Sequence, residues 1–237
     1  MLKIKAYAKV NLYLKVEKKD LTGYHKIESL ITYVKNLYDE ILILSDKETK
    51  DIIVCNKKTL EKNNFLFIVL KILREREIIN KFYKIKLKKR IPLGAGLGGG
   101  TSDAFFLAKY FTQDKKILKE IAKQVGYDSF FYISSFHSAI VSSYGEAVKK
   151  FENEILIKKK DLILTKVFCD TKKVYENFDY VPVTVNSKYN NLTDSACKLY
   201  PELKKYISRG VMSGSGSTFI KNKTFNKIKK SFFNKNF

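Results

Sequence analysis

The sequence of 237 residues has little cysteine, histidine or proline and no tryptophan. Its three cysteines, Cys55, Cys169 and Cys197, lie far apart and form no CxxC pair. This sparse, odd set argues against a zinc site and indicates reduced thiols in a cytoplasmic environment. We therefore expect no protein-bound metal centre.

Long apolar runs are also absent. The longest strongly apolar run, residues 65–70, is too short to span a bilayer. The first residues, MLKIKAYAKVNLYLKV, alternate lysine with apolar residues and lack the apolar core of a signal peptide. A hydrophobic content of 45% is typical of a globular protein. The chain is expected to form one large domain or two small ones, with no membrane partner.

Acidic residues are few, 24 against 46 basic ones, which gives a net charge of +22. Such a charge favours a polyanionic partner, such as nucleic acid, a membrane surface or a phosphorylated substrate. However, only four basic residues are arginine, the residue that most often reads base edges, and the lysines are spread along the whole chain. We attribute most of the charge to compositional drift and expect no nucleic-acid partner. A basic RNA-binding protein, with strongly salt-dependent binding, remains the alternative from another functional class.

Alternating side chains predict several β-strands. In residues 3–16 the apolar residues recur with period two, and the opposite face carries Tyr7, Lys9, Asn11 and Tyr13, which predicts a half-buried strand. Residues 40–44, 83–91 and 138–143 also resemble strands, and residues 27–34 a strand or short helix. Residues 22–25 are expected to form a turn.

Other segments have helical periodicity and residues typical of helix ends. Residues 63–77 begin with asparagine, and residues 115–125 end before Gly126. Thr101, Ser102 and Asp103 are capping types that are expected to open a helix over 101–111. Residues 145–154 resemble a crossing to a second unit. Beyond it we expect a strand at 162–168, helices at 171–178, 190–200 and 201–207, and a last helix. This mixture predicts an α+β fold with domains at 1–152 and 153–237.

Eight of the eleven glycines lie in two short stretches, residues 94–100 and 210–216. Glycine is costly in backbone entropy and is kept where the chain needs positive φ or close approach. The first stretch matches the dinucleotide fingerprint, but the doubly wound fold is not evident. It also nearly matches the Walker pattern, but Gly100 occupies the lysine position. The remaining interpretation is a phosphate cradle of backbone N–H groups before a helix start.

Five segments resemble the GHMP kinases. PLGAGLGGGTSDA (92–104) is similar to their ATP loop, and MSGSGSTFI (212–220) to their third motif. KAYAKVNLYL (5–14) and TGYHKIESL (22–30) resemble motifs of members that phosphorylate a cytidine diphosphate-linked polyol, and GYDSFFYI (126–133) resembles a further motif of the superfamily. The resemblance implies a two-domain fold: a ribosomal-protein-S5-domain-2-like N-terminal nucleotide domain and a smaller C-terminal α/β domain, with a cleft between them. Other members of the superfamily, acting on homoserine or mevalonate, are the nearest alternative.

The same resemblance assigns roles to residues. Lys9 and Asp128 would be catalytic, with the aspartate taking the proton of the acceptor hydroxyl. The ATP loop would comprise Pro92, Leu93, Gly94, Ala95, Gly96, Leu97, Gly98, Gly99, Gly100, Thr101 and Ser102. The acceptor would be bound by Asn11, Tyr24, His25, Tyr175, Gly214 and Ser215. MgATP would be the co-substrate, with Mg²⁺ held mainly through its phosphates.

Other expectations concern the remaining features. His137, amid apolar residues, is interpreted as structural, and Asp128 is also a good N-cap for the segment that follows it. The second glycine loop is expected to lie near the first. Thr22 stands where the family usually has an aspartate, and Tyr127, Ser129 and Phe130 replace its usual residues around Asp128. A monomer or weak homodimer is expected.

Overall fold

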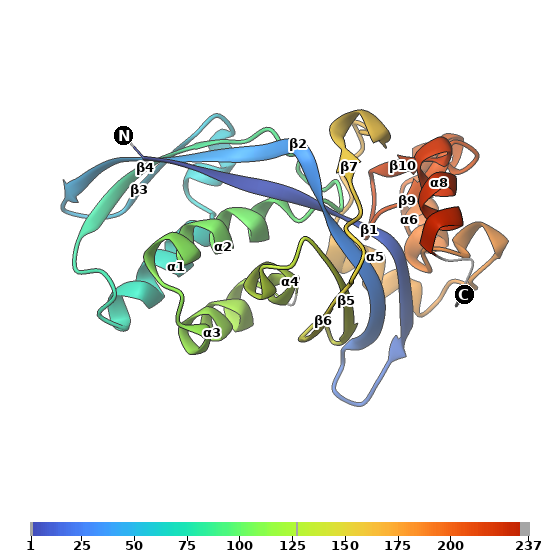
Figure 1. Ribbon diagram of the computed structural model, residues 1–237, viewed down its shortest axis with the longest axis horizontal. Helices are drawn as coiled ribbons and strands as arrows, with labels where there is room; N and C mark the ends of the chain where they lie inside the picture. Colours follow the sequence, from blue (N-terminus) through green and yellow to red (C-terminus); the bar gives the residue numbers. More distant parts are fainter. Residues whose placement is uncertain (1, 127, 233–237) are drawn as a thin grey trace. The chain divides into compact units, whose positions relative to one another are not determined.

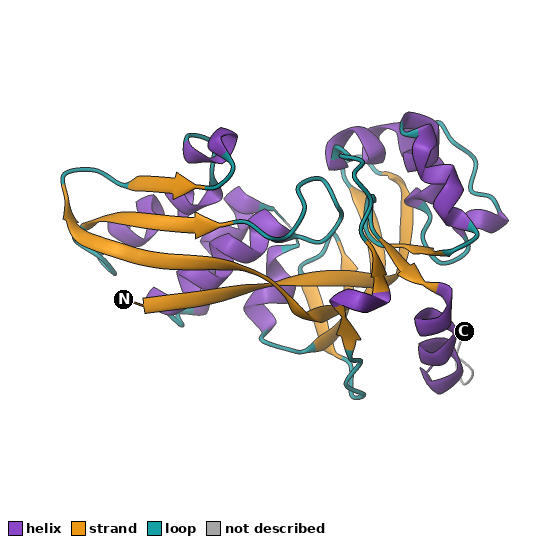
Figure 2. Cartoon of the chain, turned by 90° about the horizontal axis from the view of Figure 1, so that it is seen from above, coloured by secondary structure: helices purple, strands orange, loops and turns teal. Residues whose placement is uncertain are grey.

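The computed structural model describes residues 2–126 and 128–232 and forms two compact units. The first comprises Met1–Ala8, Asn36–Ile91 and Gly98–Ser135, and the second comprises Lys9–Lys35, Pro92–Leu97 and Phe136–Phe237. The two longest strands, β1 (Leu2–Lys19) and β2 (His25–Glu48), contribute residues to both units (Figure 2). The domain boundary at 152/153 stays a prediction, because compactness does not test where independently folding domains divide.

The first unit combines a sheet with four helices. The later part of β2 pairs antiparallel with β4 (Phe82–Lys88), and β3 (Ile52–Cys55) pairs parallel with β4. Side chains of β4 alternate, with Tyr83, Ile85 and Leu87 buried and the intervening lysines more exposed, because successive residues point to opposite faces. Figure 1 shows the helices on one face of this sheet: α1 (Phe65–Glu75), α2 (Gly99–Phe111), α3 (Lys115–Val125) and α4 (Ser129–Ser134). A short 3-10 helix, η1, spans Lys58–Glu61.

The helix ends of this unit confirm two predictions and contradict one. Asn64 caps α1 by accepting a bond from Leu66 N, and Gly126 follows α3 as its C-cap. Helix α2, however, begins at Gly99 after Gly98, which has φ +66°, a left-handed conformation that glycine adopts without strain. Thr101, Ser102 and Asp103 therefore lie inside the helix, as its third to fifth residues, and the prediction that they cap it is wrong.

The second unit contains two groups of strands. The first part of β2 pairs antiparallel with β5 (Ser138–Ser143), which pairs with β6 (Ala147–Lys150), and β7 (Ile157–Lys158) pairs parallel with β2. A small antiparallel sheet has the order β8 (Leu162–Ile163), β10 (Phe219–Lys221), β9 (Gly210–Met212). The helices of this unit are α5 (Thr171–Phe178), α6 (Leu192–Leu199), α7 (Lys204–Ile207) and α8 (Asn222–Phe232), with 3-10 helices η2 (Lys159–Asp161), η3 (Val185–Ser187) and η4 (Pro201–Leu203).

Several predicted elements have different limits. Residues 40–44 are not a separate strand but part of β2, since its pairing with β4 continues through them. Residues 145–154 are not a crossing, because β6 pairs with β5 there. The strand predicted at 162–168 is reduced to Leu162–Ile163, and the helix at 201–207 divides into η4 and α7.

The middle of strand β1, residues 8–14, is buried on both faces rather than on one. Lys9 and Asn11, on the face expected to be exposed, are each only 4% exposed. Period-two alternation reports the type of side chain and not its exposure, and polar groups are buried where hydrogen bonds satisfy them. The partners of these two residues are the start of the candidate site.

Candidate functional site

Lys9 and Asn11 are joined on one face of β1, as the alternation predicted. Lys9 Nζ donates to Asn11 Oδ1 at 2.7 Å, and Asn11 Nδ2 donates to Ser29 Oγ of β2 at 2.7 Å. The backbone N–H of Lys9 donates to Leu97 O at 3.1 Å, which attaches the strand to the first glycine loop. A charged side chain is thus held in a fixed, buried position beside that loop.

The two glycine loops pack against each other, which confirms their predicted proximity. A Cβ atom on Gly96 would lie 2.4 Å from Ser213 O and 2.7 Å from Gly216 O, so no larger residue fits there. Gly96 also has φ +69°. The backbone of the first loop is bonded from two further points, with Thr218 N donating to Ala95 O at 3.2 Å and Cys169 N to Gly94 O at 2.9 Å. Residues 94–97 of the first glycine stretch and the second stretch are therefore held together through their backbones.

Residues that the sequence did not single out hold the second loop. Asn190 Nδ2 donates to Met212 O and Gly214 O, both at 2.8 Å. The Ser215 and Thr171 hydroxyls are 2.8 Å apart, which links the loop to the first residue of α5. Asn190 and Thr171 belong to no motif used in the sequence analysis. Thr171 nevertheless begins α5, the helix that also carries Tyr175.

The structure brings His25 and Tyr175 together although 149 residues separate them in the sequence. Their ring centroids are 5.5 Å apart, and the Phe178 ring is 5.9 Å from the imidazole. His25 Nδ1 lies 2.9 Å from Glu17 O, and because a carbonyl only accepts, Nδ1 carries the hydrogen. Nε2 lies 3.6 Å from Asp179 Oδ2. The imidazole is thus oriented through Nδ1, whereas Nε2 has no hydrogen-bond partner among the described residues.

Asp20 explains how the turn before His25 is held without the usual aspartate at position 22. Its Oδ1 accepts from Thr22 N at 2.8 Å, and its Oδ2 accepts from Tyr144 OH at 2.6 Å. Hydrogen bonds from Thr22 and Tyr144 lower the pKa of Asp20 to about 2. Tyr24 is 54% exposed, and its ring centroid is 6.2 Å from that of Tyr144. An aromatic ring is therefore presented to solvent on an anchored turn.

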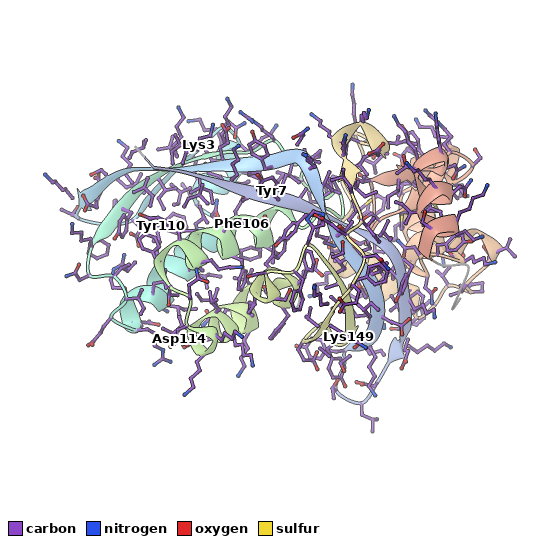
Figure 3. The ribbon with its side chains drawn as sticks, viewed as in Figure 1. Lys3, Tyr7, Phe106, Tyr110, Asp114 and Lys149 are labelled. Carbon is purple, nitrogen blue, oxygen red and sulfur yellow. The ribbon has the colours of Figure 1, made fainter. Side chains whose placement is uncertain are left out.

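The later part of the first glycine loop belongs to the first unit and opens α2. Gly98 O accepts from Ser102 N at 2.8 Å and from Tyr132 OH at 3.2 Å. The Ser102 hydroxyl is buried and donates to Tyr7 O at 2.7 Å, while the Tyr7 ring lies 5.9 Å from that of Phe106 (Figure 3). The first amides of a helix have no intrahelical acceptor and favour an anion. The first residues of α2 thus present backbone amides of the kind that favour an anion.

Asp128 is also part of the first unit. It is exposed and directly precedes α4, but its side chain does not cap that helix. Its predicted position as the N-cap residue of α4 is therefore confirmed, but its side chain forms no cap hydrogen bond. Tyr127, one of the replaced residues beside it, lies outside the described residues, whereas Ser129 is buried.

A buried charged cluster that the sequence analysis missed lies beneath the start of α2. Lys89 Nζ contacts Asp39 Oδ2 and lies 2.6 Å from Asp103 Oδ2, with all three side chains at most 3% exposed. Asp39 Oδ1 also accepts from Ile91 N at 2.8 Å. A Cβ atom on Gly99 would lie 3.2 Å from Lys89 Nζ. The cluster therefore links β2, the residue after β4 and the N-terminal part of α2.

In this cluster the carboxyl groups of Asp39 and Asp103 both contact the single ammonium group of Lys89. Burial raises the pKa of Asp103 to about 8, with Asp39 adding to the shift and Lys89 opposing it. Asp103 Oδ1 has no hydrogen-bond partner among the described residues. Burial alone would lower the pKa of Lys89, but the two carboxylates outweigh it and raise that pKa.

This cluster gives a pH prediction. Between the ordinary pKa of 3.8 and the folded value of about 8, the folded protein holds a proton on Asp103 that the unfolded chain has lost. Stability should therefore fall as pH rises, with a limiting slope of about 1.4 kcal/mol per pH unit. Asp103→Asn cannot ionise and should lack this component. Denaturant unfolding of both proteins at pH 5–8 measures it, and parallel stability curves would contradict the shifted pKa.

The remaining candidate groups are accounted for within their units. His137 Nε2 lies 3.3 Å from Ile155 O and the ring packs against Tyr33, in keeping with a structural role. Within residues 2–126 and 128–232, no group of three or more His, Cys, Asp or Glu side chains could hold a metal ion. Over the same residues, no helix has the length and apolar character needed to cross a membrane.

Comparison with known proteins identifies relatives over nearly the whole chain. The profile of the GHMP kinases N terminal domain matches residues 64–130. The chain is 33% identical to a 4-diphosphocytidyl-2-C-methyl-D-erythritol kinase of Campylobacter jejuni, covering 92% of this chain and 99% of the relative. It is 32% identical to a protein of the same name from Ureaplasma parvum, covering 95% and 97%.

A solved structure shows the same fold. The crystal structure of a 4-(cytidine 5'-diphospho)-2C-methyl-D-erythritol kinase superposes with a TM-score of 0.69 at 23% identity, covering 97% of this chain and 94% of the other. Together with the profile match, this confirms the predicted α+β fold of the GHMP kinases.

Proposed function

The chain belongs to the 4-diphosphocytidyl-2-C-methyl-D-erythritol kinase family, and from this membership we propose that it transfers the γ-phosphoryl group of ATP to the 2-hydroxyl of 4-diphosphocytidyl-2-C-methyl-D-erythritol. The reaction would be a step of the non-mevalonate route to isoprenoids. The observation that carries the choice of acceptor is the contact between His25 and Tyr175, at 5.5 Å between ring centroids. The acceptor of a homoserine or mevalonate kinase carries no nucleobase for these rings to bind.

ATP binding is proposed for Pro92–Ser102. The packed glycine backbone and the first amides of α2 support this role, since N–H groups and the helix dipole favour phosphate. Ser102 would contribute by holding the loop in place, because its N–H donates to Gly98 O and its buried hydroxyl donates to Tyr7 O. Mg²⁺ would enter with ATP and be held mainly by phosphate oxygens and water, where it would neutralise developing charge on the phosphates.

Catalysis is proposed to depend on Asp128 and Lys9. Asp128 would accept the proton of the acceptor 2-hydroxyl. The hydroxyl oxygen would form a bond to the γ-phosphorus of ATP as the bond between that phosphorus and the bridging β-phosphate oxygen breaks, which leaves ADP. The Lys9 ammonium would stabilise negative charge on the transferred group. Phosphoryl transfer needs mostly positioning and charge stabilisation, and the bond to Asn11 Oδ1 supports a positioned ammonium.

Acceptor binding is proposed for Asn11, Tyr24, His25, Tyr175, Gly214 and Ser215. The exposed Tyr24 ring and the Tyr175 ring are suited to stacking on a cytosine, while the fixed imidazole of His25 is suited to a hydrogen bond with the base. The anchoring of the turn through Asp20 and of the second loop through Thr171 supports a preorganised surface.

The proposed function is tested by ADP release from MgATP with 4-diphosphocytidyl-2-C-methyl-D-erythritol, and in parallel with homoserine and mevalonate. Turnover with the cytidyl acceptor alone is expected. Turnover with another acceptor would support the kinase assignment but contradict the proposed cytidine-binding site. No turnover with any acceptor, together with salt-sensitive RNA binding, would favour the basic RNA-binding alternative.

His25→Ala is expected to raise the KM for the cytidyl acceptor by about tenfold or more, the loss of roughly one hydrogen bond to a fixed partner. The KM for ATP should change less than about twofold, since the glycine loops are untouched. His137→Ala is the matched control, because His137 is the second of the two histidines and is interpreted as structural. Equal increases in both KM values, or an equal effect of the control, would contradict the assigned role.

Two further properties remain part of the proposal. Cys55, Cys169 and Cys197 are buried free thiols, which supports a cytoplasmic location. Assembly as a monomer or weak homodimer stays a prediction, to be measured by sedimentation.

A further inference from the structure

Ser29 lies at the end of a buried hydrogen-bond chain that starts at Lys9. Its side chain is fully buried on β2. Its Oγ lies 2.6 Å from Tyr13 O and 2.7 Å from Asn11 Nδ2. The chain therefore runs from the Lys9 ammonium through the Asn11 amide and the Ser29 hydroxyl to a backbone carbonyl.

The chemistry of these groups permits only one direction of donation. A carbonyl oxygen only accepts, so the single proton of the Ser29 hydroxyl is donated to Tyr13 O. In this chain Ser29 Oγ can then only accept, and Asn11 must turn its NH₂ group toward it. Asn11 Oδ1 consequently faces Lys9, whose ammonium only donates.

The opposite orientation of the amide loses both bonds. If Asn11 were flipped, its NH₂ would face the Lys9 ammonium, donor against donor, and its oxygen would face the lone pairs of Ser29 Oγ. Asn11 N also donates to Ser213 Oγ at 2.9 Å, so the backbone cannot easily shift to relieve the conflict. Ser29 thereby decides which end of the amide meets the lysine.

We propose that Ser29 is a positioning residue for the reaction, which sets the Asn11 amide and through it fixes the ammonium of Lys9. The proposal rests on the proposed function, in which Lys9 acts on the transferred phosphoryl group. Ser29 touches neither substrate in this role. Without its hydroxyl the amide can rotate, and the lysine loses its fixed acceptor for part of the time.

Ser29→Ala should lower kcat about 10- to 100-fold while the KM values for ATP and acceptor change less than about threefold. Ser138→Ala is the matched control, since Ser138 Oγ is likewise buried in the second unit and contacts Thr32 Oγ1 at 2.8 Å. The control should lose comparable stability but little kcat. Ser29→Cys keeps the volume and should give an intermediate rate. Equal rates for Ser29→Ala and Ser138→Ala would overturn the proposal.

A double-mutant cycle separates positioning from a general structural effect. An aspartate side chain at position 11 has two acceptor oxygens in place of one oxygen and one NH₂ group, so no partner is needed to orient it. In an Asn11→Asp background, Ser29→Ala should therefore cost less than about threefold in kcat. The same 10- to 100-fold loss in both backgrounds would overturn the proposal.

A readout without turnover distinguishes this inference from the proposed function. The Asn11 side-chain NH₂ signals, assigned by their loss in Asn11→Asp, should exchange slowly with solvent in the wild type and faster in Ser29→Ala. Slow exchange in both proteins would contradict the orienting role even if the kinase activity is confirmed. A difference in exchange without kinase activity would uphold the orientation and place the failure in the proposed function.

Discussion

Asp128→Asn is expected to lower kcat by about 10²- to 10⁴-fold, the range for removing a positioned general base. Asparagine has the size of aspartate but cannot take up the proton of the attacking hydroxyl. Because the residue is exposed and its side chain does not cap α4, the melting temperature should change little. ATP binding should be retained, since the glycine loops are unaltered. Steady-state kinetics with the cytidyl acceptor and calorimetric titration of ATP measure these effects.

Asp114→Asn provides the control for removing a carboxylate from the same unit. Asp114 caps α3 by accepting a bond from Lys116 N at 2.7 Å, and asparagine caps a helix about as well, so both stability and rate should stay close to the wild type. Undiminished turnover in Asp128→Asn would remove Asp128 from the mechanism. A loss of ATP binding in parallel with kcat would instead indicate a disturbed loop.

Local patterns predicted the elements whose signals lie within a few residues. Helix α1 follows from Asn64 and helical periodicity, and α3 ends before Gly126 as expected. The shared face of Lys9 and Asn11 followed from period two. The start of α2 was missed because a left-handed glycine, Gly98, is as good a boundary as the polar residues after it.

The long-range parts of the site could be inferred only through family resemblance, or not at all. Nothing in the local sequence pairs His25 with Tyr175, since that contact is made by folding distant segments together. Ser29 stood within a quoted motif, yet its use depends on the direction of two hydrogen bonds. The sequence analysis missed Lys89 because the chain contains many lysines, and no local pattern distinguishes a buried lysine from the exposed ones.

Lys89→Met is expected to destabilise the protein by about 3–5 kcal/mol, the cost of leaving a buried charge without its partner. Asp39 would keep bonds from backbone N–H groups but lose the ammonium that contacts it. For a chain of this size, the melting temperature should fall by roughly 6–20 °C. Lys88→Met, an exposed neighbour on β4, is the control and should stay close to the wild type.

The pH dependence and a second substitution distinguish lost charge pairing from lost packing. Methionine retains most of the volume of lysine, so a packing defect should be small and independent of pH. A charge defect should shrink toward acid pH, where a carboxylate left without its ammonium takes up a proton. It should also be partly relieved in Lys89→Met/Asp39→Asn, which removes the carboxylate that Lys89 contacts. A pH-independent deficit that Asp39→Asn does not relieve would mean that Lys89 contributes by shape. Relief by the second substitution would show that the start of α2, and with it the proposed phosphate-binding backbone, depends on the balance of charge beneath it.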